Sequence, residues 1–230
     1  MTIPDSTTAR TEILDRVRSA LTGSRPVPST VSRPDTDVAP TGGTDSSPGR
    51  TAPAQRRTRL SDRFVERVED YRATVRTCGP ADLAGEVASA LHGADSVIIP
   101  TGFERKWTKA VSARIVDEAE VPDVRDVEGV AAVLTTSVVA IAETGTIILD
   151  HGPGQGRRGL SLLPDRHVCV VHTHQIVPGV PDAVAVLRAS IEAGRPLTWI
   201  SGPSATSDIE LVRVEGVHGP RTLTVILVTS

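Results

Sequence analysis

Aromatic residues are scarce in this chain. Phenylalanine, tyrosine and tryptophan make up 2% of its 230 residues, whereas hydrophobic residues as a whole make up 39%. The core must therefore be built mainly from valine, isoleucine, leucine and alanine. Runs of branched aliphatic residues are typical of strands that are buried on both faces of a sheet.

Cysteine is almost absent as well. Cys78 and Cys169 lie far apart in the sequence, and no CxxC spacing occurs. This pattern argues against a disulfide framework and against an iron–sulfur cluster or other metal site held by this chain alone. We expect both residues to be buried thiols in a reducing compartment.

Strong charge and long apolar runs are also missing. The formal net charge is −3, so the chain lacks the excess of basic residues that is typical of nucleic-acid-binding proteins. No run approaches the ~18 apolar residues of a membrane span. The first residues lack the basic and apolar regions of a signal peptide. We therefore expect a cytoplasmic protein with no membrane span and no nucleic-acid partner.

Three segments differ in composition. Residues 1–22 include an apolar stripe at helical spacing, formed by Ile13, Leu14, Val17 and Leu21, which predicts an N-terminal amphipathic helix. Residues 23–58 are dominated by proline, glycine, serine and threonine and predict a disordered spacer. Residues 59–230 contain the remaining apolar runs and are expected to form the folded domain.

The folded domain reads as an α/β protein. Aliphatic runs at 96–99, 130–134, 146–149, 167–172, 197–200 and 223–228 predict strands, and helical patterns lie between several of them. One such pattern predicts a helix that carries Val111, Ile115 and Val116, and a turn or short helix is expected between the runs 130–134 and 146–149. This alternation predicts a mostly parallel sheet covered by helices on both faces. Ligands of such sheets bind in loops beyond the carboxyl ends of strands. The glycine-bearing turns are therefore the candidate sites, and we expect three of them to meet at one edge of the sheet.

The first turn is Glu143-Thr144-Gly145, which precedes the run 146–149. A carboxylate beside a glycine can serve as a general base, a nucleophile or a ligand contact. Glycine also allows a tight turn or a close approach of a ligand to the backbone. The alternative is a tight turn with a solvated glutamate.

The second turn is Gly202-Pro-Ser204-Ala-Thr206-Ser-Asp208, which follows a predicted strand. Backbone N–H groups and hydroxyls in such a turn can hold a carboxylate or a phosphate. The Gly-Lys-Ser/Thr ending of a P-loop is absent. The alternative is an ordinary loop with a serine helix cap.

The third turn is Gly216-Val-His218-Gly-Pro-Arg221. His218 can transfer a proton near neutral pH, and Arg221 can pair with a carboxylate. The alternative is a rigid connection into the last strand. Two weaker patterns are His172-x-His174, a possible pair of metal ligands, and the glycine-rich basic stretch 152–158, either a lid over an anion or a flexible loop.

Four segments together resemble one known family. AETGTIIL, SLLPDRHVCVV followed by QIV, SGPSATSDIE and GVHGPRTLTVIL occur in order over residues 60–230. They are similar to the lactate utilisation protein C family, whose members contain an LUD domain. The resemblance implies a three-layer α/β/α sandwich like that of the sugar-phosphate isomerases and CoA transferases. It also implies action with two iron–sulfur partner proteins that oxidise L-lactate to pyruvate, so that the clusters lie in those partners.

Three functions are consistent with this resemblance. The chain can be a subunit that binds a small carboxylate or organises the redox subunits. In that case Thr144, Gly145, Gly202, Ser204, Thr206, Asp208 and Arg221 are the candidate ligand contacts, and Glu143 and His218 are the candidate proton-transfer groups. It can instead be a stand-alone enzyme, since related CoA transferases use a glutamate beside a glycine as nucleophile. It can also be a scaffold without a ligand.

Overall fold

The computed structural model describes residues 53–127, 129–206, 214–215 and 219–229, together with Asp15. The predicted N-terminal helix within 1–22 and most of the predicted spacer therefore lie outside the described residues. The first described element of the folded unit is helix α2, Pro53–Asp70. It starts before residue 59, so the last residues of the stretch expected to be spacer are helical. Phe64 and Val68 of α2 are fully buried.

The centre of the fold is a parallel six-stranded sheet with the order β1-β12-β7-β4-β2-β3. Its strands are β1 (Thr74–Cys78), β2 (Ser96–Ile99), β3 (Arg114–Asp117), β4 (Ala132–Thr136), β7 (Arg166–His172) and β12 (Thr222–Val228). In β7, the residues between His167 and Val171 are all buried. This confirms the mostly parallel sheet that the aliphatic runs predict.

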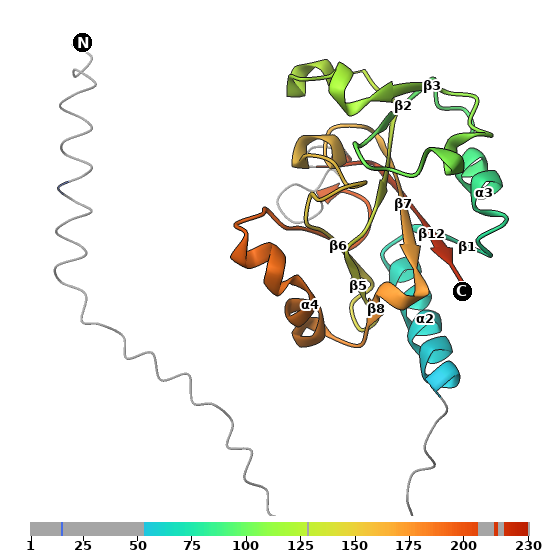
Figure 1. The fold of residues 1–230 in the computed structure, drawn as a ribbon, viewed down its shortest axis with the longest axis vertical. Helices are drawn as coiled ribbons and strands as arrows, with labels where there is room; N and C mark the ends of the chain where they lie inside the picture. The colour runs from blue at the N-terminus through green and yellow to red at the C-terminus, as the bar shows by residue number, and fades with distance from the viewer. Residues whose placement is uncertain (1–14, 16–52, 128, 207–213, 216–218, 230) are drawn as a thin grey trace, which may run out of the picture. The chain divides into compact units, whose positions relative to one another are not determined.

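A second, smaller sheet corrects the three-layer prediction. It has the order β8-β5-β6-β9 and mixes parallel and antiparallel pairs. Its strands are β5 (Val139–Ile141), β6 (Thr146–Leu149), β8 (Ile176–Val177) and β9 (Thr198–Ile200). Ile147 and Leu149 pack toward the main sheet, and Ile148 packs toward helix α4 (Val180–Glu192). Because β5 and β6 are apolar on both faces, they form an additional layer between the main sheet and α4 (Figure 1).

The main sheet is covered differently on its two faces. Helix α2 and the small sheet pack on one face, where they bury Cys169 and Val171 of β7. Helix α3 (Leu83–Ala90) packs on the other face, over Val168 and Val170 of the same strand. The two faces therefore follow the alternation of side chains along a strand. Figure 1 shows α3 and α4 on opposite sides of the main sheet.

Two local predictions were wrong. The residues Val111, Ile115 and Val116 had the spacing of a helix, but Arg114–Asp117 is strand β3 and pairs with β2. β-Branched residues such as Ile115 and Val116 fit a paired strand well. Val139–Ile141, expected in a turn or short helix, is strand β5. None of the described helices combines the length and apolar character needed to cross a bilayer.

Candidate functional site

The second and third predicted turns meet in space. The Ser204 N–H donates a hydrogen bond to the Pro220 carbonyl oxygen at 2.8 Å. Gly202 has a φ of +99° and lies against Tyr71, the residue after α2, because an added Cβ would be 2.7 Å from the Tyr71 Cβ. Only glycine fits this conformation and this space without displacing Tyr71. The close approach fixes the turn against Tyr71, and the Ser204–Pro220 hydrogen bond holds it beside the segment that enters β12.

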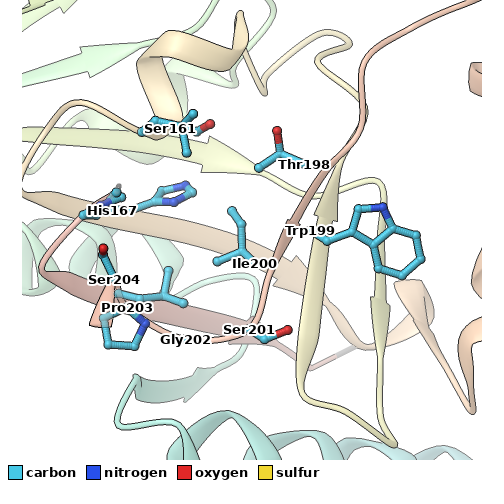
Figure 2. Close-up of a pocket in the computed structure, with 13 residues that line it drawn as sticks. Ser161, His167, Thr198, Trp199, Ile200, Ser201, Gly202, Pro203 and Ser204 are labelled. Carbon is cyan, nitrogen blue, oxygen red and sulfur yellow. The ribbon is translucent and has the colours of Figure 1, made fainter. Parts of the chain in front are cut away.

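These turns border a cavity of about 150 Å³, which we call the amino-edge pocket. Its lining includes Ser161, His167, Thr198, Ile200, Gly202, Ser204, Pro220 and Leu223. His167 and Leu223 are the second residues of β7 and β12. The pocket therefore lies at the amino ends of these strands, and the expectation that the turns lie beyond carboxyl ends is wrong for the main sheet. Figure 2 shows the His167 imidazole among the lining side chains, while the Trp199 indole points away.

His167 is a buried polar group in the wall of this pocket. Its Nε2 lies 2.7 Å from the Thr135 hydroxyl of the neighbouring strand β4. Burial lowers the pKa of His167 to about 4, so the imidazole is neutral near pH 7. A neutral imidazole can exchange a hydrogen bond with a hydroxyl without the cost of burying a charge.

The first turn is connected to this pocket by a chain of hydroxyls. Thr144 Oγ1 lies 2.7 Å from Thr146 Oγ1, which lies 2.8 Å from Ser201 Oγ at the pocket wall. Gly145 has a φ of +62° and contacts α2, where an added Cβ would be 2.7 Å from the Arg67 carbonyl carbon. The structure thus gives Gly145 a packing role.

Glu143 itself is exposed and is not among the residues that line the amino-edge pocket. Its N–H donates to the Pro178 carbonyl at 3.1 Å, and its Oε2 lies 3.1 Å from the position a Cβ would take on Gly179. Gly179 is the residue before α4. A carboxylate at this place is favourable for the amino end of the helix dipole.

The remaining predicted site residues have different positions. Arg221 directly follows the pocket residue Pro220, and its guanidinium lies 3.7 Å from the Asp165 carboxylate in an exposed pair. Thr206 belongs to strand β10 (Ala205–Thr206), which pairs with β11 (Val214–Glu215). Asp208 and His218 lie outside the described residues. The structure therefore brings Gly202 and Ser204 together in the pocket, with Arg221 next to it in the chain.

The sulfur and imidazole groups do not form a shared metal site in the described part of the chain. Cys78 and Cys169 pack in cores on opposite faces of the main sheet. Burial raises the pKa of the Cys169 thiol to about 12, which disfavours the thiolate that a metal requires. His172 and His174 stack with ring centroids 5.3 Å apart. Burial, followed by the charge of His174, lowers the pKa of His172.

Sequence reasoning missed three polar residues of the pocket, namely Ser161, His167 and Thr198. The Ser161 hydroxyl donates to the Arg158 carbonyl at 3.0 Å. Thr198 Oγ1 lies 2.8 Å from His151 Nε2. The signal for His167 was its place inside the apolar strand HVCVV, because a histidine in such a run must find a buried partner.

Comparisons with known proteins identify the class to which this fold belongs. The family model of the LUD domain matches residues 61–228. A crystal structure described as a DUF162 family protein from Deinococcus radiodurans is 42% identical and superposes with a TM-score of 0.66. It matches 75% of this chain and 98% of the other chain. The described fold is therefore that of an LUD domain.

Full-length relatives narrow the class further. The lactate utilization protein C of Deinococcus radiodurans is 44% identical over 228 residues, which cover 99% of each chain. That of Geobacillus sp. (strain WCH70) is 35% identical over 128 residues, or 54% of this chain and 49% of the relative. That of Bacillus subtilis (strain 168) is 37% identical over 101 residues, or 42% of each. The chain belongs to the lactate utilisation protein C family.

Proposed function

We propose that the chain is a subunit of a complex that oxidises L-lactate to pyruvate, and that it binds this small acid in the amino-edge pocket. The observation that supports the metabolic role is the 44% identity to a lactate utilization protein C over the whole chain. The pocket supports the ligand-binding role, because it lies where two predicted turns meet.

The size of the pocket fits the ligand. A cavity of about 150 Å³ can hold benzene, which has as many non-hydrogen atoms as lactate, and the amino-edge pocket has this volume. Ser204 supplies a hydroxyl to the carboxylate, while its N–H remains occupied by Pro220. Arg221 can turn from Asp165 to the ligand, because exposed ion pairs of this kind are weak. Neutral His167 contacts the 2-hydroxyl group.

The electrons released by lactate go to partner proteins in this proposal. Oxidation removes an electron pair and two protons from the substrate. The two thiols of this chain are buried in separate cores and do not fit a cluster. Iron–sulfur clusters of partner subunits would therefore accept the electrons, and this chain would position the acid and hold those subunits together.

The test is ligand-induced thermal stabilisation by millimolar L-lactate or pyruvate. A ligand at ten times its dissociation constant stabilises the native state by about 1.4 kcal/mol. We expect this gain for the wild type and for the control Ser112→Ala, whose side chain is exposed. Ser204→Ala and Arg221→Ala should each reduce it. No gain in the isolated chain or in the assembled complex would refute the binding role.

Co-purification separates the binding role from the alternatives. A subunit should be recovered with iron–sulfur proteins when it is isolated by a tag from cells grown on lactate. A scaffold would give the same recovery without any stabilisation by lactate. A stand-alone transferase would instead form a covalent adduct at Glu143 with an acyl-CoA, and Glu143→Gln would abolish the adduct in mass spectra.

A further inference from the structure

The opposite edge of the main sheet contains the position where open α/β sheets bind ligands. The chain leaves β2 for β3 on one side and leaves β4 for β7 on the other side. Adjacent strands whose connections diverge in this way create a crevice at their carboxyl ends, and ligands bind there. In this fold the crevice lies between the ends of β2 and β4.

The glycine-rich stretch 152–158 crosses this crevice. The Gly154 N–H donates to the Thr101 carbonyl after β2 at 2.8 Å. The Gly154 carbonyl accepts from the Thr136 N–H at the end of β4 at 2.9 Å. Gly154 has a φ of +78°, and an added Cβ would be 2.9 Å from Thr136 Oγ1. The stretch is therefore attached to both strands.

Beside this stretch lies a cleft of about 560 Å³, which we call the carboxyl-edge cleft. Its lining includes Thr101, Gly102, Glu118, His151, Gly156, Arg157 and Arg158. Its volume is within the range of small-molecule sites, about 300–1,000 Å³. None of these residues lines the amino-edge pocket.

The cleft offers donors that are not used within the protein. Arg158 is exposed and its guanidinium makes no hydrogen bond or ion pair with the described residues. The N–H groups of Gly102 and Gly156 likewise have no acceptor there. Both glycines have positive φ, at 84° and 68°. Backbone N–H groups in such turns form concave sites that bind anions.

The one carboxylate in the lining is already engaged. Glu118 accepts hydrogen bonds from the Thr101 N–H at 3.0 Å and from the Arg157 N–H at 3.1 Å. The Arg157 guanidinium donates to the carbonyls of Val121 and Pro122. Glu118 and Arg157 thus hold the lining segments of the cleft in place through these hydrogen bonds. Arg158 remains as the charged group that can bind a ligand.

The stretch is held in place by groups behind it. Asp150 is buried, accepts from Ser190 Oγ at 2.6 Å and from the Gly152 N–H at 3.1 Å, and pairs with Arg195 at 3.1 Å. His151 has a φ of +57°, which is unfavourable for a residue with a Cβ. Its Nδ1 lies 2.7 Å from the Gly156 carbonyl. Strained backbone that the surroundings fix in this way is frequent at ligand sites.

We propose that the carboxyl-edge cleft binds the phosphate group of a small organic phosphate. Two glycine N–H groups and the forked guanidinium of Arg158 provide more donors than the two oxygens of a carboxylate need, and a phosphate group presents three acceptor oxygens. The rest of the cleft accommodates the organic part of the ligand. This site is separate from the proposed lactate site.

Calorimetric titration with inorganic pyrophosphate tests the proposal on the full chain. We expect saturable binding in the millimolar range or tighter. Arg158→Ala should weaken it tenfold or more, because a charge-assisted hydrogen bond to the anion is lost, and Arg158→Glu should abolish it. Arg188→Ala is the matched control, since Arg188 is an exposed arginine on α4 outside the cleft lining, and it should bind like the wild type.

Three results would overturn the proposal. They are the absence of saturable binding, equal affinity of the wild type and Arg158→Ala, and an equal loss in Arg188→Ala, which would indicate a general charge effect. Acetate titrated in the same way should bind at least tenfold more weakly than pyrophosphate. Equal binding of acetate would contradict the assignment to phosphate. Each variant replaces an exposed side chain, so the circular dichroism spectrum should not change.

Discussion

The two edges of the main sheet carry cavities of opposite character. The amino-edge pocket is small, at about 150 Å³, and the described residues around it offer hydroxyls and one neutral imidazole. The carboxyl-edge cleft is larger, at about 560 Å³, and contains two arginines and several glycines. The main sheet thus has a small uncharged pocket at the amino ends of its strands and an open cationic cleft at their carboxyl ends.

The two cavities are connected by hydrogen bonds. Thr198 of the amino-edge pocket contacts His151 of the carboxyl-edge cleft at 2.8 Å. Ser161 of the pocket donates to the carbonyl of Arg158 in the cleft at 3.0 Å. Variants that affect one cavity and leave the other intact therefore test how independent the two edges are.

The largest effect on stability is expected for Asp150→Ala, which removes the buried carboxylate that holds the stretch 152–158 beside the cleft. Asp150 is buried, accepts hydrogen bonds from Ser190 and Gly152 and pairs with Arg195, whose side chain is 40% exposed. Removing a buried charged acceptor together with its hydrogen bonds costs about 3 kcal/mol. We expect the free energy of unfolding to fall by about this amount in urea titrations. Amide exchange should accelerate over 152–158. Asp165→Ala, the control at an exposed aspartate, should leave the free energy of unfolding nearly unchanged. An equal destabilisation by both variants would contradict the role of Asp150 in holding the stretch 152–158.

The next effect concerns His167 at the other edge. Its folded pKa of about 4 is below the ordinary value of 6.5, so the unfolded state binds more protons between these values. The stability associated with neutral His167 is present above pH 6.5 and is lost as the pH falls toward 4. The wild type should lose about 2 kcal/mol more between pH 7 and pH 5 than His167→Gln does. Parallel pH profiles of the two proteins would show that the imidazole is not buried as described.

A smaller effect is expected for Thr198→Val, which removes one hydrogen bond between the edges. The free energy of unfolding should fall by about 1 kcal/mol, which is the usual net contribution of such a hydrogen bond. If the edges are independent, Thr198→Val should alter pyrophosphate binding by less than Arg158→Ala does. A larger change in calorimetric titrations would show that the His151 contact controls the cleft.

The smallest effect on stability is expected for Arg221→Ala. Its pair with Asp165 is exposed on both sides and spans 3.7 Å, so the free energy of unfolding should change by less than about 0.5 kcal/mol. The stabilisation by L-lactate should nevertheless decrease. A variant that loses stability without losing the lactate effect would assign Arg221 a structural role only.

The sequence predicted the parts of the fold that depend on local pattern. The aliphatic runs at 146–149, 167–172 and 223–228 are strands, because runs of branched aliphatic residues are typical of strands that are buried on both faces. The second sheet was missed, because Val139–Ile141 is short and gains its pairing from β6 and β8. Neighbours of that kind are not visible in a local window.

The same limit applies to the candidate sites. Gly202 and Ser204 could be found, since glycine and hydroxyls after a strand mark a turn. His167 had a signal in its place inside an apolar run, but its partner Thr135 could not be predicted, because Thr135 comes from another strand. The stretch 152–158 is recognisable in the sequence as glycine-rich and basic, but its position at the crevice depends on the strand order β4-β2-β3. Strand order is set by tertiary packing rather than by local composition.

The most direct test of two separate binding sites is a titration of L-lactate into the protein, carried out in the absence and in the presence of saturating pyrophosphate. Separate sites at the two edges predict that lactate binds with nearly the same affinity in both samples, and that Ser204→Ala weakens it in both. Displacement of lactate by pyrophosphate, with the apparent dissociation constant rising in proportion to the competitor, would show one shared site and contradict the account.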